Sequence, residues 1–412
     1  MASRRHVARL RAYLGMQHNI LVLTGAGLVQ SFGVLLWSGY LPKVLEALGA
    51  RGLMIGAFGT VGALLGVFLP YVGGVLSDRL GRGRVMVLAS LLAASGYLVY
   101  AVAPVWWAFF PGVVLTTAAG SLGFMGGLAL TGASVRSRRR GISIAARGTL
   151  GMILGSPAPA LGGVLIWWIG LVRGVRVALL ITVLLTLAGA WLQQRYYRFP
   201  PVTAERRARG ARPARTPMSR ELKGLLVADC LLRFGSGMSA TFVVLYVMNV
   251  LGATAVEFGL LTALATLTAA FLVLPASRLS DRAGPAGRHP VVASAYFFFA
   301  AFPLALAVIP SARWLIPVFI ISGLRHVGEP TRKALIIDLS EAADRGRLIG
   351  AYHSIRAAVV FPAALAGGAL WEWVPAAPFI IGGAVSSLGV IWFLLSRPGT
   401  RRDVAIRPPW RR

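Results

Sequence analysis

The chain has 412 residues, of which 57% are hydrophobic and 13% are charged. A soluble protein of this length needs more polar surface, so a soluble enzyme is excluded and most side chains must face lipid or other helices. The net charge of +29 would suit a nucleic-acid binder. The basic residues lie between apolar stretches, however, which is the pattern of a membrane protein, and no nucleic-acid partner is expected.

Apolar stretches of about 20 residues, the length that crosses a membrane as a helix, recur along the whole chain. In the first half we expect them at residues 19–41, 52–76, 85–103, 105–135, 142–169 and 175–194. In the second half we expect them at residues 222–250, 256–277, 290–309, 314–339, 348–374 and 378–396. They predict an all-α integral membrane protein with about twelve transmembrane helices.

Residues 196–220 separate the two sets of stretches and are basic, polar and proline-containing. A segment of this composition is typical of a linker. We therefore expect an N-terminal six-helix bundle at residues 1–195, a basic cytoplasmic linker at 196–220 and a C-terminal six-helix bundle at 221–412.

The distribution of basic residues predicts the orientation. If Met1 lies inside, most Lys and Arg side chains fall on the side of the termini, and few lie on the other side: Lys43, Arg51, Arg173, Arg176 and Arg313. Cytoplasmic loops carry the excess of positive charge, so both termini are expected in the cytoplasm of a multi-pass cell-membrane protein.

The two halves also match one another at an offset of about 203 to 205 residues. Ser77-Asp78-Arg79 matches Ser280-Asp281-Arg282, Gly56 matches Gly259, and Gly162-Gly163 matches Gly367-Gly368. Matches of Gly alone are common by chance in such a chain, whereas collinear Asp-Arg matches are not. The pattern indicates a parallel repeat of the kind found in some transporters.

A charged, glycine-rich segment follows the second apolar stretch and contains Gly74, Asp78, Arg79, Gly81 and Arg82. It predicts a tight hairpin between two helices, because glycine permits sharp turns and close helix approach. The spacing resembles the signature loop of the major facilitator superfamily, and the helix number and the repeat agree with that family over essentially the whole chain. The resemblance implies two six-helix bundles that rock about a central cavity. It also implies that Asp78 latches the bundles, while the arginines either join this gate or simply anchor the topology.

The fifth apolar stretch contains Pro157, Pro159, Gly162 and Gly163. Proline bends a helix, and paired glycines allow close packing. The segment is similar to the Gly-Pro-x-x-Gly-Gly signature of drug–proton antiporters, with Ala158 in place of its first glycine. The resemblance favours export. The departure at Ala158, and the matching Pro362 and Gly367-Gly368 in the other half, leave an alternative in which both segments are helix kinks that serve packing.

Ionisable residues at membrane depth are costly and are therefore functional candidates. Asp229 and Glu329 are the candidates for carrying a proton. The pKa of a buried carboxyl group beside an arginine can change when the site opens to one or the other side of the membrane. Arg233 lies four residues after Asp229, and Arg325 lies four residues before Glu329. The alternative is that each pair is intrahelical and merely neutralises itself.

Candidates for the substrate cavity come from both halves. The second half offers Arg233, Arg325, His326, His353 and Arg356, and arginines suit an anionic substrate. The two histidines could instead be polar residues near the cytoplasmic side. The first half offers an uncharged aromatic and hydrogen-bonding wall that suits a partly apolar ligand: Gln30, Trp37 and Tyr40.

The single cysteine, Cys230, excludes an internal disulfide and a multi-cysteine metal site. No Walker loop or Ser/His/Asp arrangement stands out, so no catalytic residue, metal or cofactor is expected. We expect a monomeric secondary active transporter in membrane lipid that exports a small organic compound in exchange for protons. Proton-linked or facilitated uptake of a small metabolite, including an anionic one, is the alternative, and a membrane-embedded scaffold or lipid-modifying enzyme is the third class.

Overall fold

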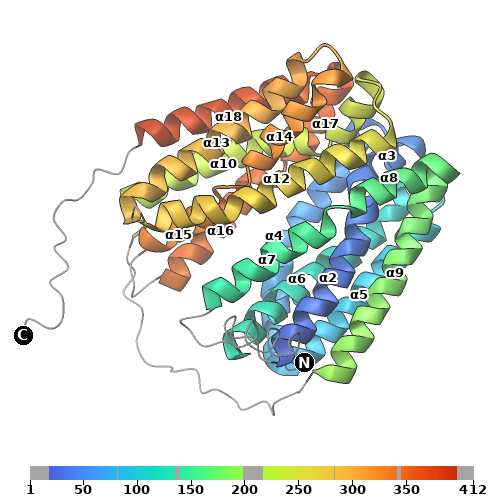
Figure 1. Ribbon diagram of the computed structural model, residues 1–412, viewed down its shortest axis with the longest axis horizontal. Coiled ribbons are helices and arrows are strands. Elements are labelled where there is room, and N and C mark those ends of the chain that lie inside the picture. Colours follow the sequence, from blue (N-terminus) through green and yellow to red (C-terminus); the bar gives the residue numbers. More distant parts are fainter. Residues whose placement is uncertain are drawn as a thin grey trace, which may run out of the picture.

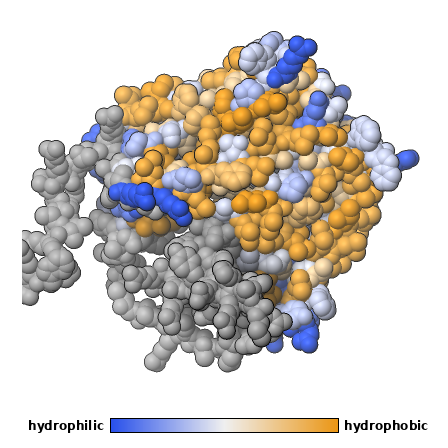
Figure 2. All heavy atoms as spheres, viewed as in Figure 1, coloured by the Kyte–Doolittle hydropathy of each residue, from blue (hydrophilic) through white to orange (hydrophobic). Residues whose placement is uncertain are grey.

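The computed structural model describes residues 18–80, 82–134, 140–197, 217–282, 284–340 and 345–396, and every regular element within these ranges is a helix. Ten of the described helices are long and apolar enough to cross a membrane, or eleven if one bent pair is counted as a single span. Large apolar side chains cover most of the visible face in Figure 2. Large aromatic side chains of the described residues are also strongly exposed: Tyr71 is 80% exposed and Trp168 is 77% exposed. A surface of this kind belongs against lipid.

The first half folds into a group of helices whose bounds follow the predicted stretches. They are α2 (His18–Trp37), η1 (Ser38–Tyr40), α3 (Leu41–Ala47), α4 (Gly52–Leu80), α5 (Arg82–Val102), η2 (Trp106–Phe109), α6 (Phe110–Ser134), α7 (Arg140–Gly155), α8 (Ala158–Ile169) and α9 (Leu171–Tyr196).

The second half repeats this order. Its elements are α10 (Arg220–Ala240), α11 (Val243–Leu245), η4 (Tyr246–Val250), α12 (Ala255–Arg282), α13 (Gly284–Val308), η5 (Ala312–Trp314), α14 (Leu315–Leu324), α15 (Glu329–Asp338), α16 (Arg345–Val360), α17 (Ala363–Trp373) and α18 (Ala377–Leu395).

Two of the expected elements differ from the prediction. The connection between α4 and α5 is shorter than predicted, because α4 runs on to Leu80 and α5 begins at Arg82, so that Asp78 and Arg79 belong to the last turns of a helix and not to a loop. The single helix expected over residues 314–339 is wrong. It is broken after Leu324, because Pro330 in the first turn of α15 has no N–H to continue the helical hydrogen bonds.

The helices form two bundles, coloured blue to green and yellow-green to red in Figure 1. We call the end where α2 begins and α18 finishes the terminal end, and the other the opposite end. Figure 1 shows the bundles closest together at the opposite end and further apart toward the terminal end. The two-bundle prediction is confirmed, while the exact boundaries of the expected linker lie mostly outside the described residues and stay a prediction.

Glycines let the backbones of the two bundles touch at the opposite end. A Cβ on Gly56 of α4 would lie 2.4 Å from the carbonyl oxygen of Ala364, at the start of α17. A Cβ on Gly259 of α12 would lie 2.4 Å from the carbonyl oxygen of Pro159, at the start of α8. Gly56 and Gly259 are the glycines matched by the repeat, so the duplicated sequence builds two equivalent contacts.

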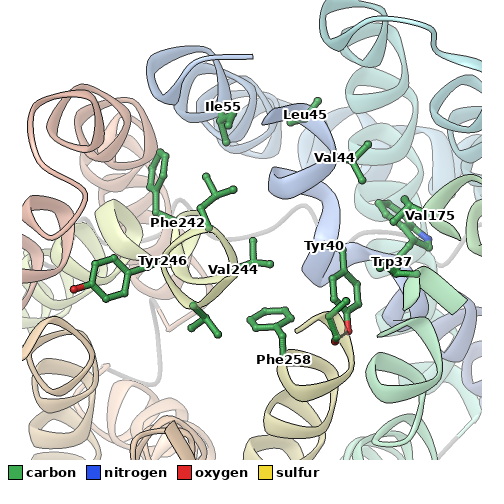
Figure 3. Close-up of a cluster of buried hydrophobic side chains, with 14 of the residues drawn as sticks. Trp37, Tyr40, Val44, Leu45, Ile55, Val175, Phe242, Val244, Tyr246 and Phe258 are labelled. Atoms are coloured by element: carbon green, nitrogen blue, oxygen red, sulfur yellow. Dashed lines mark hydrogen bonds between the residues drawn. The ribbon is translucent and has the colours of Figure 1, made fainter. Parts of the chain in front are cut away.

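Buried aromatic side chains fill the space between the bundles near these contacts (Figure 3). The Tyr40 side chain is fully buried, and its hydroxyl donates to the carbonyl oxygens of Pro159 and Ala255, each at 2.8 Å. Its ring packs edge-on against Phe258, with centroids 5.4 Å apart. Tyr40 therefore ties α8 of one bundle to α12 of the other.

Polar contacts at the opposite end join the same two bundles. The Asn249 side-chain amide donates to the Glu46 carboxylate at 2.8 Å, and Lys43 contacts both of these residues. The backbone N–H of Leu53 donates to the Glu372 carboxylate at 3.0 Å, which places a negative charge at the N-terminus of α4. The opposite end is therefore closed by both backbone packing and hydrogen bonds.

Candidate functional site

Two cavities lie along the inner faces of the bundles. The central cavity has a volume of about 560 Å³ and is lined by both halves, including Phe58 of α4 and Phe258 of α12. The N-bundle cavity has a volume of about 680 Å³ and is lined almost wholly by the first half. Thr266 of α12 lines both. Each volume is in the range of pockets that hold small organic ligands.

The N-bundle cavity is uncharged along all of its described lining. The Gln30 side-chain amide donates to the Ser90 hydroxyl at 2.8 Å, and this hydroxyl donates to the side-chain amide oxygen of Gln193 at 3.0 Å. Gln30 thus lies at a cavity, where the sequence predicted it. Trp37 and Tyr40, by contrast, are 4% and 0% exposed and pack within the helical core rather than line either cavity.

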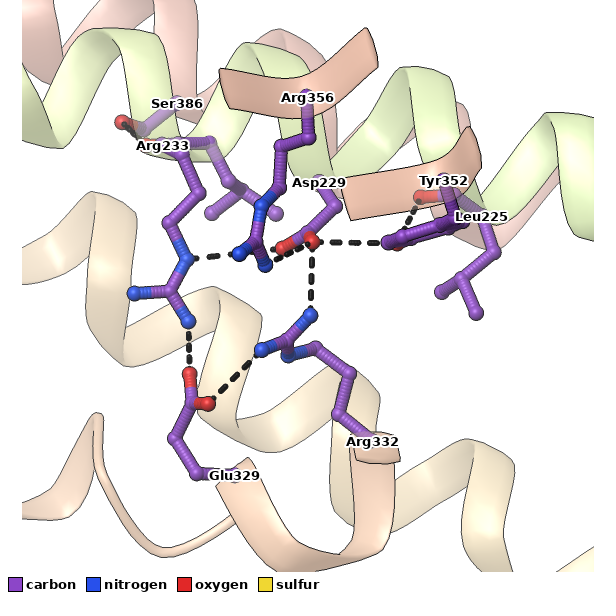
Figure 4. Close-up of polar contacts among 9 residues, drawn as sticks. Leu225, Asp229, Arg233, Glu329, Arg332, Tyr352, Arg356 and Ser386 are labelled. Carbon is purple, nitrogen blue, oxygen red and sulfur yellow. Dashed lines mark hydrogen bonds and ion pairs between the residues drawn. The ribbon is translucent and has the colours of Figure 1, made fainter. Parts of the chain in front are cut away.

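A cluster of five charged side chains lies in the second bundle, where α10, α15 and α16 meet (Figure 4). Its centre is Asp229, which is fully buried. Arg332 and Arg356 donate to the same Asp229 oxygen, at 2.7 and 3.0 Å. The Tyr352 hydroxyl donates to that oxygen at 3.1 Å. Several charge-assisted hydrogen bonds therefore hold one buried carboxylate.

Glu329 supplies the second carboxylate of this charge cluster. Arg332 donates to one of its oxygens at 2.9 Å, and Arg233 forms an ion pair with the other. The Arg233 Nε also lies 3.6 Å from Asp229, one helical turn away. The charge cluster, which we define as Asp229, Arg233, Glu329, Arg332 and Arg356, thus sets three guanidinium groups against two carboxylates.

The intrahelical pair expected between Arg325 and Glu329 is absent from the described residues. The break between α14 and α15 separates the two residues, and Glu329 turns to arginines on α10 and α15 instead. The intrahelical contact between Asp229 and Arg233 does occur. It is one part of a network that spans three helices, not a self-contained pair.

Arg325 and His326 face the central cavity from the break between α14 and α15. The guanidinium of Arg325 lies over the Phe302 ring, 4.7 Å from its centroid, and 5.8 Å from that of Phe299. Its Nε donates to the His326 ring nitrogen at 3.3 Å. No carboxylate of the described residues lies within ion-pair distance of Arg325.

The proline–glycine segment of the fifth stretch breaks the helix as predicted, between α7 and α8 at Ser156 and Pro157. Gly162 lets α8 approach α2, since a Cβ there would lie 1.8 Å from the Leu36 carbonyl oxygen. Gly163 lets α8 approach α12, since a Cβ there would lie 2.4 Å from the Ala255 carbonyl oxygen. These contacts agree with a packing role, and an antiporter role for the segment stays a prediction.

The remaining predicted residues are scattered. Gly74 lies in α4 with nothing within 4 Å of where a Cβ would sit, so it serves no close helix approach. Gly81 lies outside the described residues, and the gating roles of Asp78, Arg79 and Arg82 stay predictions. His353 on α16 packs edge-on against Tyr352, with ring centroids 5.6 Å apart, and lines neither cavity.

Two members of the site, Arg332 and Tyr352, were not predicted from the sequence. Both were signalled by spacing, since Arg332 follows Glu329 by three residues and Tyr352 precedes Arg356 by four, so each shares a helix face with a predicted residue. Among the described residues, no three His, Cys, Asp or Glu side chains gather to form a metal site.

Comparison with known proteins identifies the family. The Major Facilitator Superfamily model matches residues 23–228 and 225–412. The class C tetracycline resistance protein of Escherichia coli is 28% identical over 363 residues, which cover 82% of this chain and 85% of that protein.

Solved structures share the fold at lower identity. The nucleoside transporter NupG superposes with a TM-score of 0.68 at 15% identity, covering 92% of this chain and 99% of that one. The human organic anion transporter MFSD10 superposes with a TM-score of 0.64 at 18% identity, covering 91% and 99%. With its lipid-facing helices and its two bundles around a cavity, the chain is a multi-pass membrane transporter, not an enzyme, and it belongs to the major facilitator superfamily.

Proposed function

We propose that this protein exports a small organic compound across the cell membrane by alternating access, in exchange for protons. The observation that carries the proposal is the central cavity, which lies between the two bundles and is lined by both of them. The bundles meet at the opposite end through close glycine contacts, buried aromatic side chains and a few hydrogen bonds, and an exchange of these contacts for contacts at the terminal end would open the cavity to the other side. With both termini in the cytoplasm, as the basic residues favour, the closed end faces outward.

The charge cluster supports proton coupling. The Glu329 side chain is 24% exposed, whereas that of Asp229 is fully buried, so Glu329 is the carboxylate that a proton can reach. Its two oxygens contact Arg233 on α10 and Arg332 on α15. Protonation of Glu329 would remove the charge that holds these helices together. Binding of a proton could therefore change the conformation of the bundle. We assign Asp229 the role of a permanent anchor for the arginines.

Export is supported by the name of the tetracycline resistance relative and by the proline–glycine segment of α7 and α8. The nucleoside and organic anion transporters show that proteins with this fold carry other cargoes. Uptake of a small metabolite therefore remains the second candidate, and one observation favours an anionic cargo: arginines outnumber carboxylates at the site.

The experiment is flux in proteoliposomes that contain the purified full chain, with an imposed pH gradient and radiolabelled tetracycline, uridine and benzoate as probes. Exchange predicts that an inside-acidic gradient drives accumulation of at least one probe and that Glu329→Gln abolishes this coupling. Glu221→Gln, at the start of α10, is the matched control and should transport normally. Saturable flux that ignores the pH gradient would dismiss proton coupling. Accumulation with an outside-acidic gradient that exceeds the passive accumulation in protein-free liposomes would establish uptake instead.

A further inference from the structure

We infer that the central cavity binds an organic anion with an apolar, ring-containing body, and that Arg325 is the residue that holds its negative charge. This inference rests on the proposed transport function, because it names the class of substrate that the site accepts. It follows from the partners of each arginine at the site and from the lining of the cavity.

The second bundle carries an excess of positive charge, although of the charged residues at this site only Arg325 lines the central cavity. Arg233, Arg332 and Arg356 all lie against carboxylates, and their combined charge already exceeds that of Asp229 and Glu329 by one. Arg325 adds a second positive charge in excess. An uncompensated cation at membrane depth is costly. An anion that enters the cavity therefore gains binding free energy from the excess positive charge, and the low dielectric strengthens this attraction.

The Arg325 guanidinium is available to a ligand. Aromatic rings and its position at the C-terminal end of α14 stabilise this cation without consuming its donors. Only its Nε donates to a described residue, so both terminal amino groups remain free to bind a ligand. A guanidinium with two free donors matches the geometry of a carboxylate or sulfonate.

The rest of the cavity wall is mostly apolar and aromatic. Apart from Arg325 and His326, the described lining contains no ionisable group. Aromatic rings from both bundles line it: Phe58, Phe258, Phe302 and Phe319. Single hydroxyl groups lie between them: Ser38, Thr241, Thr262, Thr266 and Ser322. Such a wall suits an apolar ring system and offers few partners to a strongly polar body such as a sugar.

The arginines of the charge cluster are poorer anchors. To bind a ligand, Arg233 must leave Glu329, and Arg356 must leave Asp229, so each exchange sacrifices an existing ion pair. Arg325 gives up no ion pair. An inside-negative membrane potential also favours outward movement of an anion, so this substrate class agrees with export.

The test measures binding to the full chain in detergent by isothermal titration calorimetry. The probes are benzoate, naphthalene-2-carboxylate and biphenyl-4-carboxylate, each beside its uncharged carboxamide. We expect at least one acid to bind and to do so more tightly than its amide. Arg325→Gln should weaken acid binding by about ten- to a hundredfold, the size of a lost charged hydrogen bond. Arg325→Lys should keep the preference for the acid.

Arg313→Gln is the matched control, because Arg313 is an exposed arginine of η5 that lines neither cavity. The melting temperature of each variant is measured to show that it is folded. The inference is overturned if no acid binds, if amides bind as tightly as acids, or if folded Arg325→Gln binds acids like the unmodified chain. Flux of the same probes separates the two proposals: Arg325-dependent binding without flux removes the transport proposal alone, and flux without preference for acids removes this inference alone.

Discussion

The contact between Gly56 and Ala364 makes the strongest prediction about conformational change. Ordinary contact for a Cβ begins at 3.4 Å, and a Cβ on Gly56 would lie 2.4 Å from the Ala364 carbonyl oxygen and 3.1 Å from the Leu365 Cα. Both neighbours are backbone atoms, which cannot rotate away. Gly56→Ala therefore requires α4 and α17 to separate by about 1 Å wherever the opposite end is closed.

The free-energy cost follows from this overlap. Forcing one extra methyl group into a packed contact costs about 1–3 kcal/mol. Alternating access requires the two helices to part in the other conformation, so the cost should fall only on the one in which the opposite end is closed. A difference of this size shifts a two-state equilibrium by about 5- to 150-fold. Gly56→Ala should therefore convert a minor population that is open at the opposite end into a large one.

Pulsed electron spin resonance on the Cys230→Ala background measures the shift. One pair of spin labels at Val102 and Val308 reports on the opposite end, and a second pair at Arg84 and Leu395 reports on the terminal end; all four sites are exposed. Gly56→Ala should lengthen the distance between the first pair and shorten that between the second.

Gly66→Ala is the matched control in the same helix, since a Cβ on Gly66 meets nothing within 4 Å. It should leave both distance distributions unchanged. If Gly56→Ala also leaves them unchanged, the glycine contact does not hold the opposite end closed. If both distances lengthen, the bundles swell apart and do not rock about the cavity.

Two further predictions concern buried polar groups. Asp229→Asn should destabilise the protein by about 3–5 kcal/mol, because it leaves Arg332, whose side chain is 4% exposed, without its main counter-ion. Denaturant unfolding in detergent measures this loss, and adding Arg332→Gln should recover part of it; equal stability of Asp229→Asn and the unmodified chain would show that the charges are not coupled. Tyr40→Phe removes the hydrogen bond to the Ala255 carbonyl oxygen that joins the bundles, so it should favour opening at the opposite end by about 0.5–1.5 kcal/mol. The Val102–Val308 label pair detects this change, and an unaltered distribution would mean that the hydroxyl is dispensable.

Hydropathy and the repeat predicted most of the fold. Each apolar stretch coincides with a helix or a broken helix, because a membrane requires long apolar segments with internally bonded backbones. The repeat predicted which positions correspond, and Gly56 and Gly259 do occupy equivalent contacts. The break before α15 was also readable from Pro330, whose effect on hydrogen bonding is local.

The charge cluster was predictable only in part. Asp229, Glu329 and Arg233 stand out because charge is costly at membrane depth, but their partners depend on how α10, α15 and α16 pack against one another. Spacing along one helix therefore suggested a pair for Arg325 that does not form. Trp37 and Tyr40 show the same limit, since an aromatic residue on a helix is equally suited to a cavity wall and to packing.

The central claim is that the cavity between the bundles opens to one side of the membrane at a time. Thr262 lines that cavity. A Thr262→Cys variant on the Cys230→Ala background can be labelled with a membrane-impermeant thiol reagent in sealed vesicles of either orientation. We predict reaction from the terminal side with Gly56 present and a shift toward reaction from the opposite side with Gly56→Ala. Reaction from the same side in both backgrounds, or from neither side, would contradict the account.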